Sequence, residues 1–236
     1  MQVAIILPTY NERENISAFI LSILKTVPNV QIIVVDDNSP DGTAQIVKEL
    51  QNQFSNLRLY EREVKEGLGS AYKDTFEKIL KEEGVQALVT MDSDFSHAPE
   101  DLLPMLHLIQ TCDVVIGSRY IRGGKIHNWN FRRKMLSRMG NLYCKMLTGV
   151  PINDFTGGFN VISVKALKRV PFRDTLSSGF AFFIELKTML WKSGAKIQES
   201  PITFRDRVAG SSKISWRIIM EGLATPWKIL LKNLLR

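Results

Sequence analysis

Two aspartates, Asp92 and Asp94, directly follow an apolar run at residues 87–91. The run is typical of a buried strand, and residues i and i+2 of an extended chain project to the same side. Both carboxylates are therefore expected in one small volume at the carboxyl end of the strand, where α/β sheets bind ligands. Two such charges stay ionised when a cation lies between them, and Mg²⁺ or Mn²⁺ accepts oxygen ligands of this kind. An acidic turn without a metal is the alternative that this motif leaves open.

Acidic residues also follow two earlier apolar runs. Glu12 comes after the run at residues 3–7, and the pair Asp36 and Asp37 comes after the run at 32–35. Helical periodicity separates the runs, so the order strand, helix, strand, helix predicts a mostly parallel sheet. The carboxyl ends of such strands lie at one edge of the sheet. Acidic groups at several strand ends therefore indicate one ligand-binding site.

The spacing of apolar residues predicts the elements that must position these groups. Helices are expected at residues 16–27, 40–54, 71–81, 99–111, 135–147 and 180–192. Further strands are expected at residues 57–60 and 113–117, in a segment that ends at residue 163, near residue 197 and at residues 202–204. We interpret the chain as α/β, with one domain over residues 1–213. A C-terminal amphipathic helix is expected over residues 214–236, broken near Pro226.

The positive charge is concentrated in one segment. The 236 residues carry a net charge of +7, yet residues 114–153 contain no acidic residue and eight lysines and arginines. Such a block indicates an anionic partner: a nucleic acid, a membrane surface or a phosphorylated small molecule. The two cysteines have no metal-like spacing, and the sequence has neither a signal peptide nor a run long enough to span a membrane. We therefore expect a cytoplasmic protein in a reducing compartment.

Two other functional classes fit the sequence poorly. A nicotinamide-dependent dehydrogenase needs a small residue at the last position of its glycine-rich fingerprint, where the segment 67–72 has Tyr72. A nucleic-acid-binding protein would use aromatic residues among its cations, and Trp129 and Phe131 supply some of these. It has no need for acidic residues at three strand ends, so we predict no nucleic acid partner.

Several motifs together resemble the inverting glycosyltransferases of the A-type fold, glycosyltransferase family 2. The matching segments are LPTYNE at 7–12, VDDNSPDGT at 35–43 and DSD at 92–94. Within that family the chain is similar to the dolichol-phosphate (polyprenol-phosphate) mannose synthases. That similarity rests on MDSDFSHAP at 91–99, GSRY at 117–120, DFTGGF at 154–159 and DRVAGSSK at 206–213. It covers roughly residues 3–215 and implies a single Rossmann-like domain with a mostly parallel sheet flanked by helices.

The resemblance also implies a reaction and a site. Mannose would pass from GDP-mannose to a dolichyl or polyprenyl phosphate with inversion; a UDP-sugar donor or a hydroxyl acceptor is the alternative. The residues implied for the nucleotide sugar are Pro8, Tyr10, Glu12, Val35, Asp37, Ser93, Asp94, Arg119, Arg207 and Lys213. The implied metal site, for Mg²⁺ or Mn²⁺, is Asp92, Asp94 and Ser96, and the implied acceptor-phosphate site is Arg119, Arg133 and Ser137. Asp94, Arg119 and Arg207 would take part in the reaction itself.

The charge pattern favours a phosphate acceptor. A phosphate monoester is largely dianionic at neutral pH because its second pKa is about 6, so it needs cations to position it and no general base. The acid-free segment 114–153 suits that requirement. Glu185 lies where relatives with hydroxyl acceptors keep a carboxylate base. A structural role for Glu185 is our prediction, because a phosphate makes the base unnecessary.

The tail from Ile214 to Arg236 combines tryptophans and leucines with lysines and arginines. This pattern suits a helix in the interface of a membrane. Packing on the core or on another protein is the alternative. We expect peripheral contact with the cytoplasmic face of a membrane, either direct or through a small membrane-anchoring partner.

Overall fold

The computed structural model describes residues 1–177, 179–206 and 216–234. Arg207 and Lys213, which were predicted to contact the nucleotide sugar, lie outside the described residues. The predicted domain boundary at residue 213 lies outside them as well.

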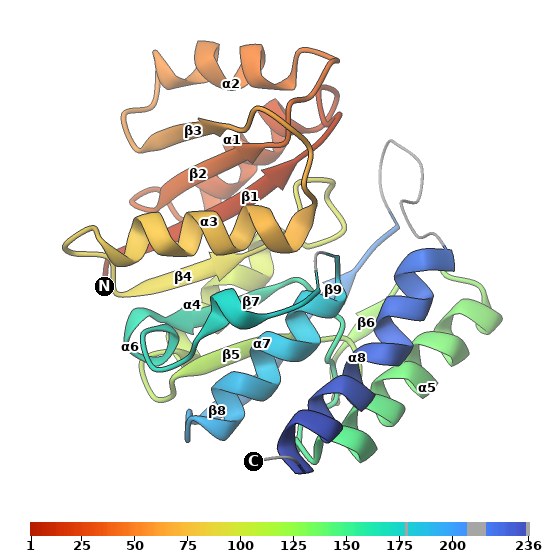
Figure 1. Cartoon of the computed structure of the whole chain (residues 1–236). Helices are drawn as coiled ribbons and strands as arrows, with labels where there is room; N and C mark the ends of the chain where they lie inside the picture. The colour runs from red at the N-terminus through yellow and green to blue at the C-terminus, as the bar shows by residue number, and fades with distance from the viewer. Residues whose placement is uncertain (178, 207–215, 235–236) are drawn as a thin grey trace.

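A seven-stranded sheet in the order β3-β2-β1-β4-β7-β5-β8 forms the centre of the molecule (Figure 1). Its strands are β1 (Val3–Thr9), β2 (Gln31–Asp36), β3 (Leu57–Glu61), β4 (Ala87–Thr90), β5 (Val114–Ser118), β7 (Asn160–Ser163) and β8 (Ile197–Pro201). β7 runs antiparallel to β4 and β5, whereas the other neighbours pair in parallel. The predicted α/β fold with a mostly parallel sheet is confirmed. A separate parallel pair joins β6 (Lys125–Ile126) to β9 (Thr203–Phe204).

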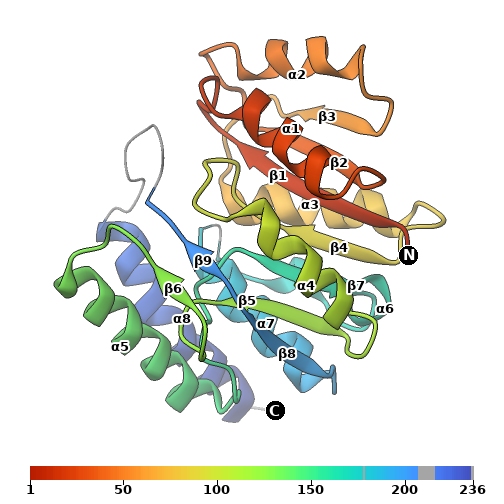
Figure 2. The ribbon, with the colours of Figure 1, turned by 180° about the vertical axis from the view of Figure 1, so that it is seen from behind.

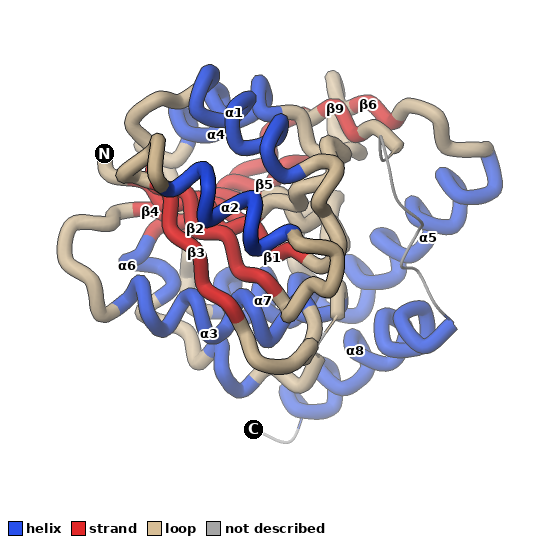
Figure 3. The backbone as a smooth tube through the Cα atoms, turned by 90° about the horizontal axis from the view of Figure 1, so that it is seen from above, coloured by secondary structure: helices blue, strands red, loops and turns tan. Residues whose placement is uncertain are grey.

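Helices cover both faces of the sheet (Figures 2 and 3). One face packs against α1 (Ile16–Thr26), α2 (Thr43–Gln51) and α4 (Leu102–Leu108), which follows the 3-10 turn Pro99–Asp101. The other face packs against α3 (Leu68–Leu80), α6 (Val164–Leu167) and α7 (Ala181–Lys192), with a second 3-10 turn at Phe172–Asp174. Side chains of successive residues in a strand point alternately into these two helical layers, as expected for an extended chain.

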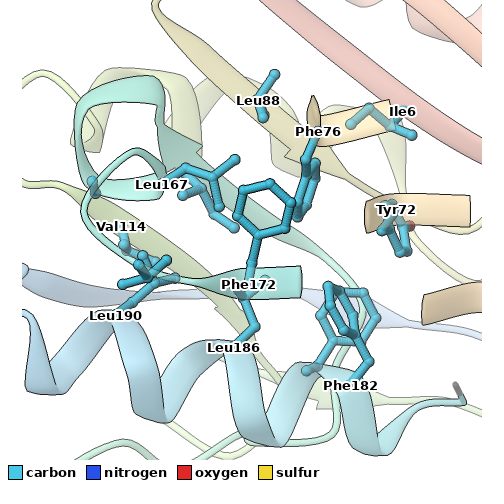
Figure 4. Close-up of a cluster of buried hydrophobic side chains, with 14 of the residues drawn as sticks. Ile6, Tyr72, Phe76, Leu88, Val114, Leu167, Phe172, Phe182, Leu186 and Leu190 are labelled. Carbon is cyan, nitrogen blue, oxygen red and sulfur yellow. The ribbon is translucent and has the colours of Figure 1, made fainter. Parts of the chain in front are cut away.

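The layer on the α3 and α7 side contains an aromatic cluster (Figure 4). Tyr72 and Phe182 stack with their ring centroids 6.1 Å apart, and Phe76 meets Phe172 edge to face at 5.6 Å. Tyr72 has no solvent-exposed surface. The glycine-rich segment before it therefore opens a helix that packs on the core, in agreement with the rejected dinucleotide fingerprint.

Two further helices, α5 (Phe131–Thr148) and α8 (Trp216–Leu234), lie side by side beyond the β5 and β8 end of the sheet (Figures 1 and 2). The Tyr143 hydroxyl of α5 donates to the Leu223 carbonyl of α8 over 2.8 Å. None of the described helices has both the length and the apolar character that crossing a membrane would require.

The predicted break at Pro226 is wrong, because α8 continues through it. A proline inside a helix removes one hydrogen bond and crowds the carbonyl four residues earlier, which here belongs to Gly222. The neighbouring Thr225 hydroxyl donates to the Glu221 carbonyl over 2.8 Å and also meets the Ser177 hydroxyl at 3.2 Å. These contacts and the packing of α8 on α5 and α7 hold the helix through the proline.

Candidate functional site

The candidate site lies at the carboxyl edge of the sheet, where β1, β2, β4 and β5 end. The antiparallel direction of β7 brings the turn that precedes it to this same edge. Asn160 at the start of β7 pairs with Thr90 at the end of β4 and with Ile116 of β5. The segment 154–159 therefore lies beside the segment after β4 and the residues after β5.

The segment that carries Asp92 and Asp94 is a tight loop, because β4 ends at Thr90. The expectation that both carboxylates continue an extended strand is therefore wrong. The Ser96 amide donates to Asp94 Oδ1 over 3.0 Å, and the Asp92 amide donates to His97 Nδ1 over 3.0 Å. Burial lowers the pKa of His97 to about 4, so its ring is neutral and Nδ1 accepts.

The loop offers hard oxygen donors. Asp94 and Ser96 are each 3% exposed, and Asp92 lies against Gly158, where a β-carbon would stand 3.5 Å from Asp92 Oδ1. In the described ranges no three or more His, Cys, Asp and Glu residues group into a metal centre. Two carboxylates and a hydroxyl nevertheless fit Mg²⁺ or Mn²⁺, which commonly take their remaining ligands from water and substrate phosphates.

Two predicted nucleotide-sugar residues meet between β1 and this loop. The Ser93 hydroxyl lies 3.4 Å from the Pro8 carbonyl oxygen, so the end of β1 contacts the Asp92–Asp94 segment directly. The ammonium of Lys65 lies 3.4 Å from the centre of the Tyr10 ring. The Glu12 carboxylate accepts a hydrogen bond from the side-chain amide of Asn15 over 3.0 Å.

Two more of the predicted nucleotide-sugar residues, Val35 and Asp37, lie at the end of β2. Asp37 forms a salt bridge with Arg62 and accepts from the Gly67 amide over 3.1 Å. Val35 and Arg62 help to line a cavity of about 360 Å³ between β2, β3 and α3. Those of the predicted nucleotide-sugar residues that the structure describes are therefore spread along the edge of the sheet from β2 to β5.

Arg119 follows β5 and forms a buried ion pair with Asp154. Its Nε and Nη2 donate to the two carboxylate oxygens of Asp154 over 2.7 Å each, and its backbone amide donates to Asp154 Oδ2 over 3.0 Å. Nη2 also donates to the Thr156 hydroxyl over 2.9 Å. Burial alone would raise the pKa of Asp154, but the Arg119 guanidinium holds it below its ordinary value. Among the described residues, no acceptor bonds to Nη1 of Arg119, and its side chain lines a large cavity.

That cavity has a volume of about 300 Å³ and is lined by both polar and apolar side chains. Its polar wall comprises Asp92, Ser96, His97, Arg119, Arg133, Ser137, Thr156, Arg205 and Asp206. Its apolar wall, between α5, α7 and α8, includes Leu136, Tyr143, Phe180, Ala181, Ile184 and Leu223. Arg133 and Tyr143 are ten residues apart on one helix, which corresponds to about 15 Å.

The cavity brings together the three residues predicted for the acceptor phosphate. Arg133 and Ser137 lie one turn apart on α5, and Arg119 reaches the cavity from β5. The Tyr120 hydroxyl donates to Ser137 Oγ over 2.6 Å, and Arg133 Nη1 donates to Asp206 Oδ1 over 3.1 Å. The helix starts earlier than predicted, because Asn130 caps it by accepting from the Arg133 amide over 2.8 Å.

Glu185 lies on α7 and does not line this cavity, although its neighbour Ile184 does. Its two carboxylate oxygens accept from the backbone amides of Leu176 and Ser177 over 3.0 and 2.9 Å. Glu185 is 7% exposed. This geometry is that of a carboxylate that fixes a loop.

Sequence reasoning missed three residues of the site. The motif DFTGGF contains Asp154, but the sequence indicated no role for it. Trp129 was named only as an aromatic residue that could stack on the bases of a nucleic acid. The Trp129 ring lies 4.0 Å from the Arg133 guanidinium carbon. Lys187 is 2% exposed on α7, a helix whose residues are mostly apolar. A lysine so surrounded is a signal of a buried, fully hydrogen-bonded charge.

Comparisons with known proteins agree over most of the chain. The family model for Glycosyl transferase family 2 matches residues 4–170. Polyprenol monophosphomannose synthase of Mycolicibacterium smegmatis is 39% identical over 221 residues, which cover 93% of this chain and 83% of that protein. Undecaprenyl-phosphate mannosyltransferase of Micrococcus luteus is 37% identical over 236 residues, which cover 97% of each chain.

Solved structures share the fold at lower identity. Glucosyl-3-phosphoglycerate synthase of Mycobacterium tuberculosis, solved with phosphoglyceric acid, has a TM-score of 0.67 at 19% identity over 97% of this chain and 80% of the other. A mannosyltransferase of Pyrobaculum calidifontis, solved with GDP-Man and Mn²⁺, has a TM-score of 0.64 at 19% identity over 98% and 68% of the two chains. These structures show the fold, and the family model and the two relatives above show that the chain belongs to glycosyl transferase family 2.

Proposed function

We propose that the protein transfers mannose from GDP-mannose to a polyprenyl phosphate with inversion of the anomeric carbon. The observation that carries the proposal is the cavity in which Arg119, Arg133 and Ser137 lie near an apolar wall formed by α5, α7 and α8. An acceptor with a phosphate head and a hydrocarbon chain matches both walls. The names of the relatives at 37–39% identity, which specify mannose and a polyprenol, agree with this choice.

In the proposed reaction the acceptor phosphate needs positioning and no base. Its second pKa is about 6, so an oxygen already carries the attacking electron pair at neutral pH. Arg133 and Ser137 hold the phosphate from α5, and Arg119 orients it from the end of β5. An oxygen of the phosphate then attacks the anomeric carbon as the bond to the nucleoside diphosphate breaks on the other side. Glu185 takes no part, because backbone amides already occupy both of its oxygens.

Asp94 and Ser96 would hold the divalent cation, with Asp92 beside them. When bound, the cation would neutralise the negative charge that develops on the leaving diphosphate. Two solved relatives agree with this assignment: the mannosyltransferase with GDP-Man and Mn²⁺, and the glucosyl-3-phosphoglycerate synthase with Mn²⁺ and UDP-glucose. They carry different nucleotides, so the proposed GDP-mannose donor rests on the mannose of the relatives above. Pro8, Tyr10, Glu12, Val35, Asp37 and Ser93 are the described residues that we assign to the donor, and Arg207 and Lys213 remain predictions.

A lipid acceptor requires access to a membrane, and α5 offers a surface for it. The α5 face is the row Phe131, Met135, Met139, Leu142 and Met146, whose members are 48–78% exposed. At about 3.6 residues per turn, Lys134, Arg138 and Lys145 border one side of the row and Arg132 borders the other. We propose that the α5 face docks on the cytoplasmic leaflet, whose anionic lipids attract these cations. Leu223, Trp227 and Leu231 on the neighbouring α8 are exposed as well.

The first test is transfer of labelled sugar to undecaprenyl phosphate in detergent, from GDP-mannose, UDP-glucose and UDP-N-acetylglucosamine, with and without a chelator. We expect label in the organic phase from GDP-mannose alone, and its loss when EDTA removes the metal. Labelling from a UDP-sugar would overturn the donor. Full transfer in excess EDTA would overturn the metal assignment.

Replacing Arg133 with alanine tests the acceptor-phosphate site. We expect kcat/KM for the lipid phosphate to fall about 10- to 100-fold, because a hydrogen bond to a charged group contributes roughly 1.5–3 kcal/mol. The KM for GDP-mannose should change little. Arg122→Ala, at an exposed position outside both the cavity and the α5 face, is the control and should keep wild-type kinetics. Equal effects of the two substitutions would count against the assignment.

Flotation with liposomes tests the α5 face. The protein should float with vesicles that contain phosphatidylglycerol, and the double variant Met139→Glu and Met146→Glu should stay in the dense fraction, because its carboxylates oppose both the apolar and the anionic surface. Leu21→Glu on α1, which changes a side chain that is 45% exposed on another face, is the control and should float. If the double variant floats like the wild type, the α5 face is not the docking surface. If the wild type floats only with a separate membrane protein present, direct docking is wrong.

A further inference from the structure

A lysine that the proposed mechanism does not use lies behind the cavity. Lys187 on α7 is 2% exposed, and its Nζ lies 2.9, 3.2 and 2.8 Å from the backbone carbonyl oxygens of Asp154, Phe155 and Gly157. An ammonium group has three N–H donors, and three carbonyls surround this one. Burying an ammonium is unfavourable unless such partners compensate it. The arrangement therefore specifies the conformation of the turn that carries those carbonyls.

Side chains from two other elements hold the amides of the same turn. The Glu199 carboxylate of β8 accepts from the backbone amides of Asn153 and Asp154 over 3.0 and 3.2 Å. Asn141 Oδ1 of α5 accepts from the Phe155 amide over 2.6 Å. The turn is thus fixed by α7 through its carbonyls and by β8 and α5 through its amides.

The fixed turn determines where Arg119 points. Asp154 Oδ2 accepts from Arg119 Nε, and Oδ1 accepts from Nη2, both over 2.7 Å. Thr156 on the same turn accepts from Nη2 over 2.9 Å. The guanidinium is planar, and two of its nitrogens donate to the two oxygens of one carboxylate. A shift of the turn would therefore reorient the guanidinium in the cavity wall.

Charge gives Lys187 a second effect on the same group. Asp154 would neutralise Arg119 if the two formed an isolated pair. Lys187 is a second buried cation near Asp154, and the Glu199 carboxylate is a second anion near Lys187. The positive charge of Lys187 therefore makes the electrostatic potential at Arg119 more favourable for an anion.

We propose that Lys187 is a positioning residue for the acceptor site: it fixes the 154–157 turn so that Asp154 presents Arg119 to a phosphate group in the cavity. This inference rests on the proposed function in one respect, the phosphate of the acceptor. A lysine with a purely structural role would change stability and leave phosphate binding unaltered.

The charged and titratable groups that face Lys187 are Asp154, Arg119, Glu199, Cys144 and His97. Burial lowers the pKa of Lys187 to about 8 and raises the pKa of Cys144 to about 12, while Arg119 holds the pKa of Asp154 low against the effect of its burial. Lys187 therefore loses its charge as the pH rises through about 8, when the acceptor phosphate is already dianionic. Binding of a phosphate lipid should weaken over this range.

The test is calorimetric binding of farnesyl phosphate to the full chain between pH 7 and 9.5, without donor or metal. We expect wild-type affinity to fall several-fold as the pH rises through about 8. Lys187→Met should bind about 10-fold more weakly at pH 7, as for loss of roughly 1.4 kcal/mol, with little further change up to pH 9.5. Lys187→Arg, which keeps its charge over this range, should recover part of the affinity at pH 7 without the decline above 8. Lys192→Met, at the exposed end of the same helix, should follow the wild type.

The outcomes separate this inference from the proposed function. If the wild type binds farnesyl phosphate and Lys187→Met binds it equally, with only a lower melting temperature, the positioning role is wrong. If the variant does not fold, the pH dependence of the wild type decides, because a flat profile overturns the inference. If the wild type does not bind farnesyl phosphate at any pH, the proposed acceptor is wrong, and the inference about Lys187 fails with it.

Discussion

The ion pair between Arg119 and Asp154 is the interaction on which the site depends. Arg119 is 8% exposed and Asp154 is fully buried, so neither charge is tolerable there alone. The pair joins the end of β5 to the turn before β7, and it places the Arg119 guanidinium in the polar wall of the cavity. The antiparallel β7 makes this possible, since a parallel strand would put its preceding turn at the opposite edge of the sheet. Gly124 lets the chain fold back over this corner, because a β-carbon there would lie 2.8 Å from the Arg119 carbonyl oxygen.

The cavity divides the proposed reaction between two chemical environments. At the polar wall, cations and a hydroxyl supply what a phosphate nucleophile requires. At the other wall, α5, α7 and α8 supply an apolar surface for a hydrocarbon chain. The same helix, α5, carries both walls, and its outer side carries the α5 face. In the proposed reaction, one helix thus links the membrane, the lipid chain and the phosphate.

The sequence predicted the sheet well because the strands at its centre are apolar on both faces. Residues 3–7, 32–35 and 87–91 are continuous apolar runs, and the alternation with helices left one main topology for them. The antiparallel direction of β7 was not predictable from its own residues, because it depends on which strands it pairs with. The continuity of α8 was missed for a similar reason: Pro226 normally indicates a break, and the packing that holds the helix through it is tertiary.

The candidate site was predictable as a set of residue types and less so as a geometry. The motifs selected Arg119, Arg133 and Ser137, which the structure brings to one cavity. They gave no indication that Asp154 pairs with Arg119 or that Lys187 bonds the turn that carries Asp154. Asp92 and Asp94 were expected on an extended strand, whereas a loop with His97 places them. The α5 face was overlooked because Arg132, Arg133 and Lys134 obscure the apolar period at the start of the helix. Its exposure became visible only once the neighbouring elements were in place.

The central claim is that the nucleophile is a phosphate held by cations, with no general base. The most direct measurement compares undecaprenyl phosphate with undecaprenol, the same chain ending in a hydroxyl, as acceptors for the wild-type enzyme at neutral pH. The proposed mechanism predicts transfer to the phosphate and none to the alcohol, because the cavity offers cations and the nearby Glu185 carboxylate is engaged by backbone amides. Transfer to the alcohol at a comparable rate would contradict that mechanism.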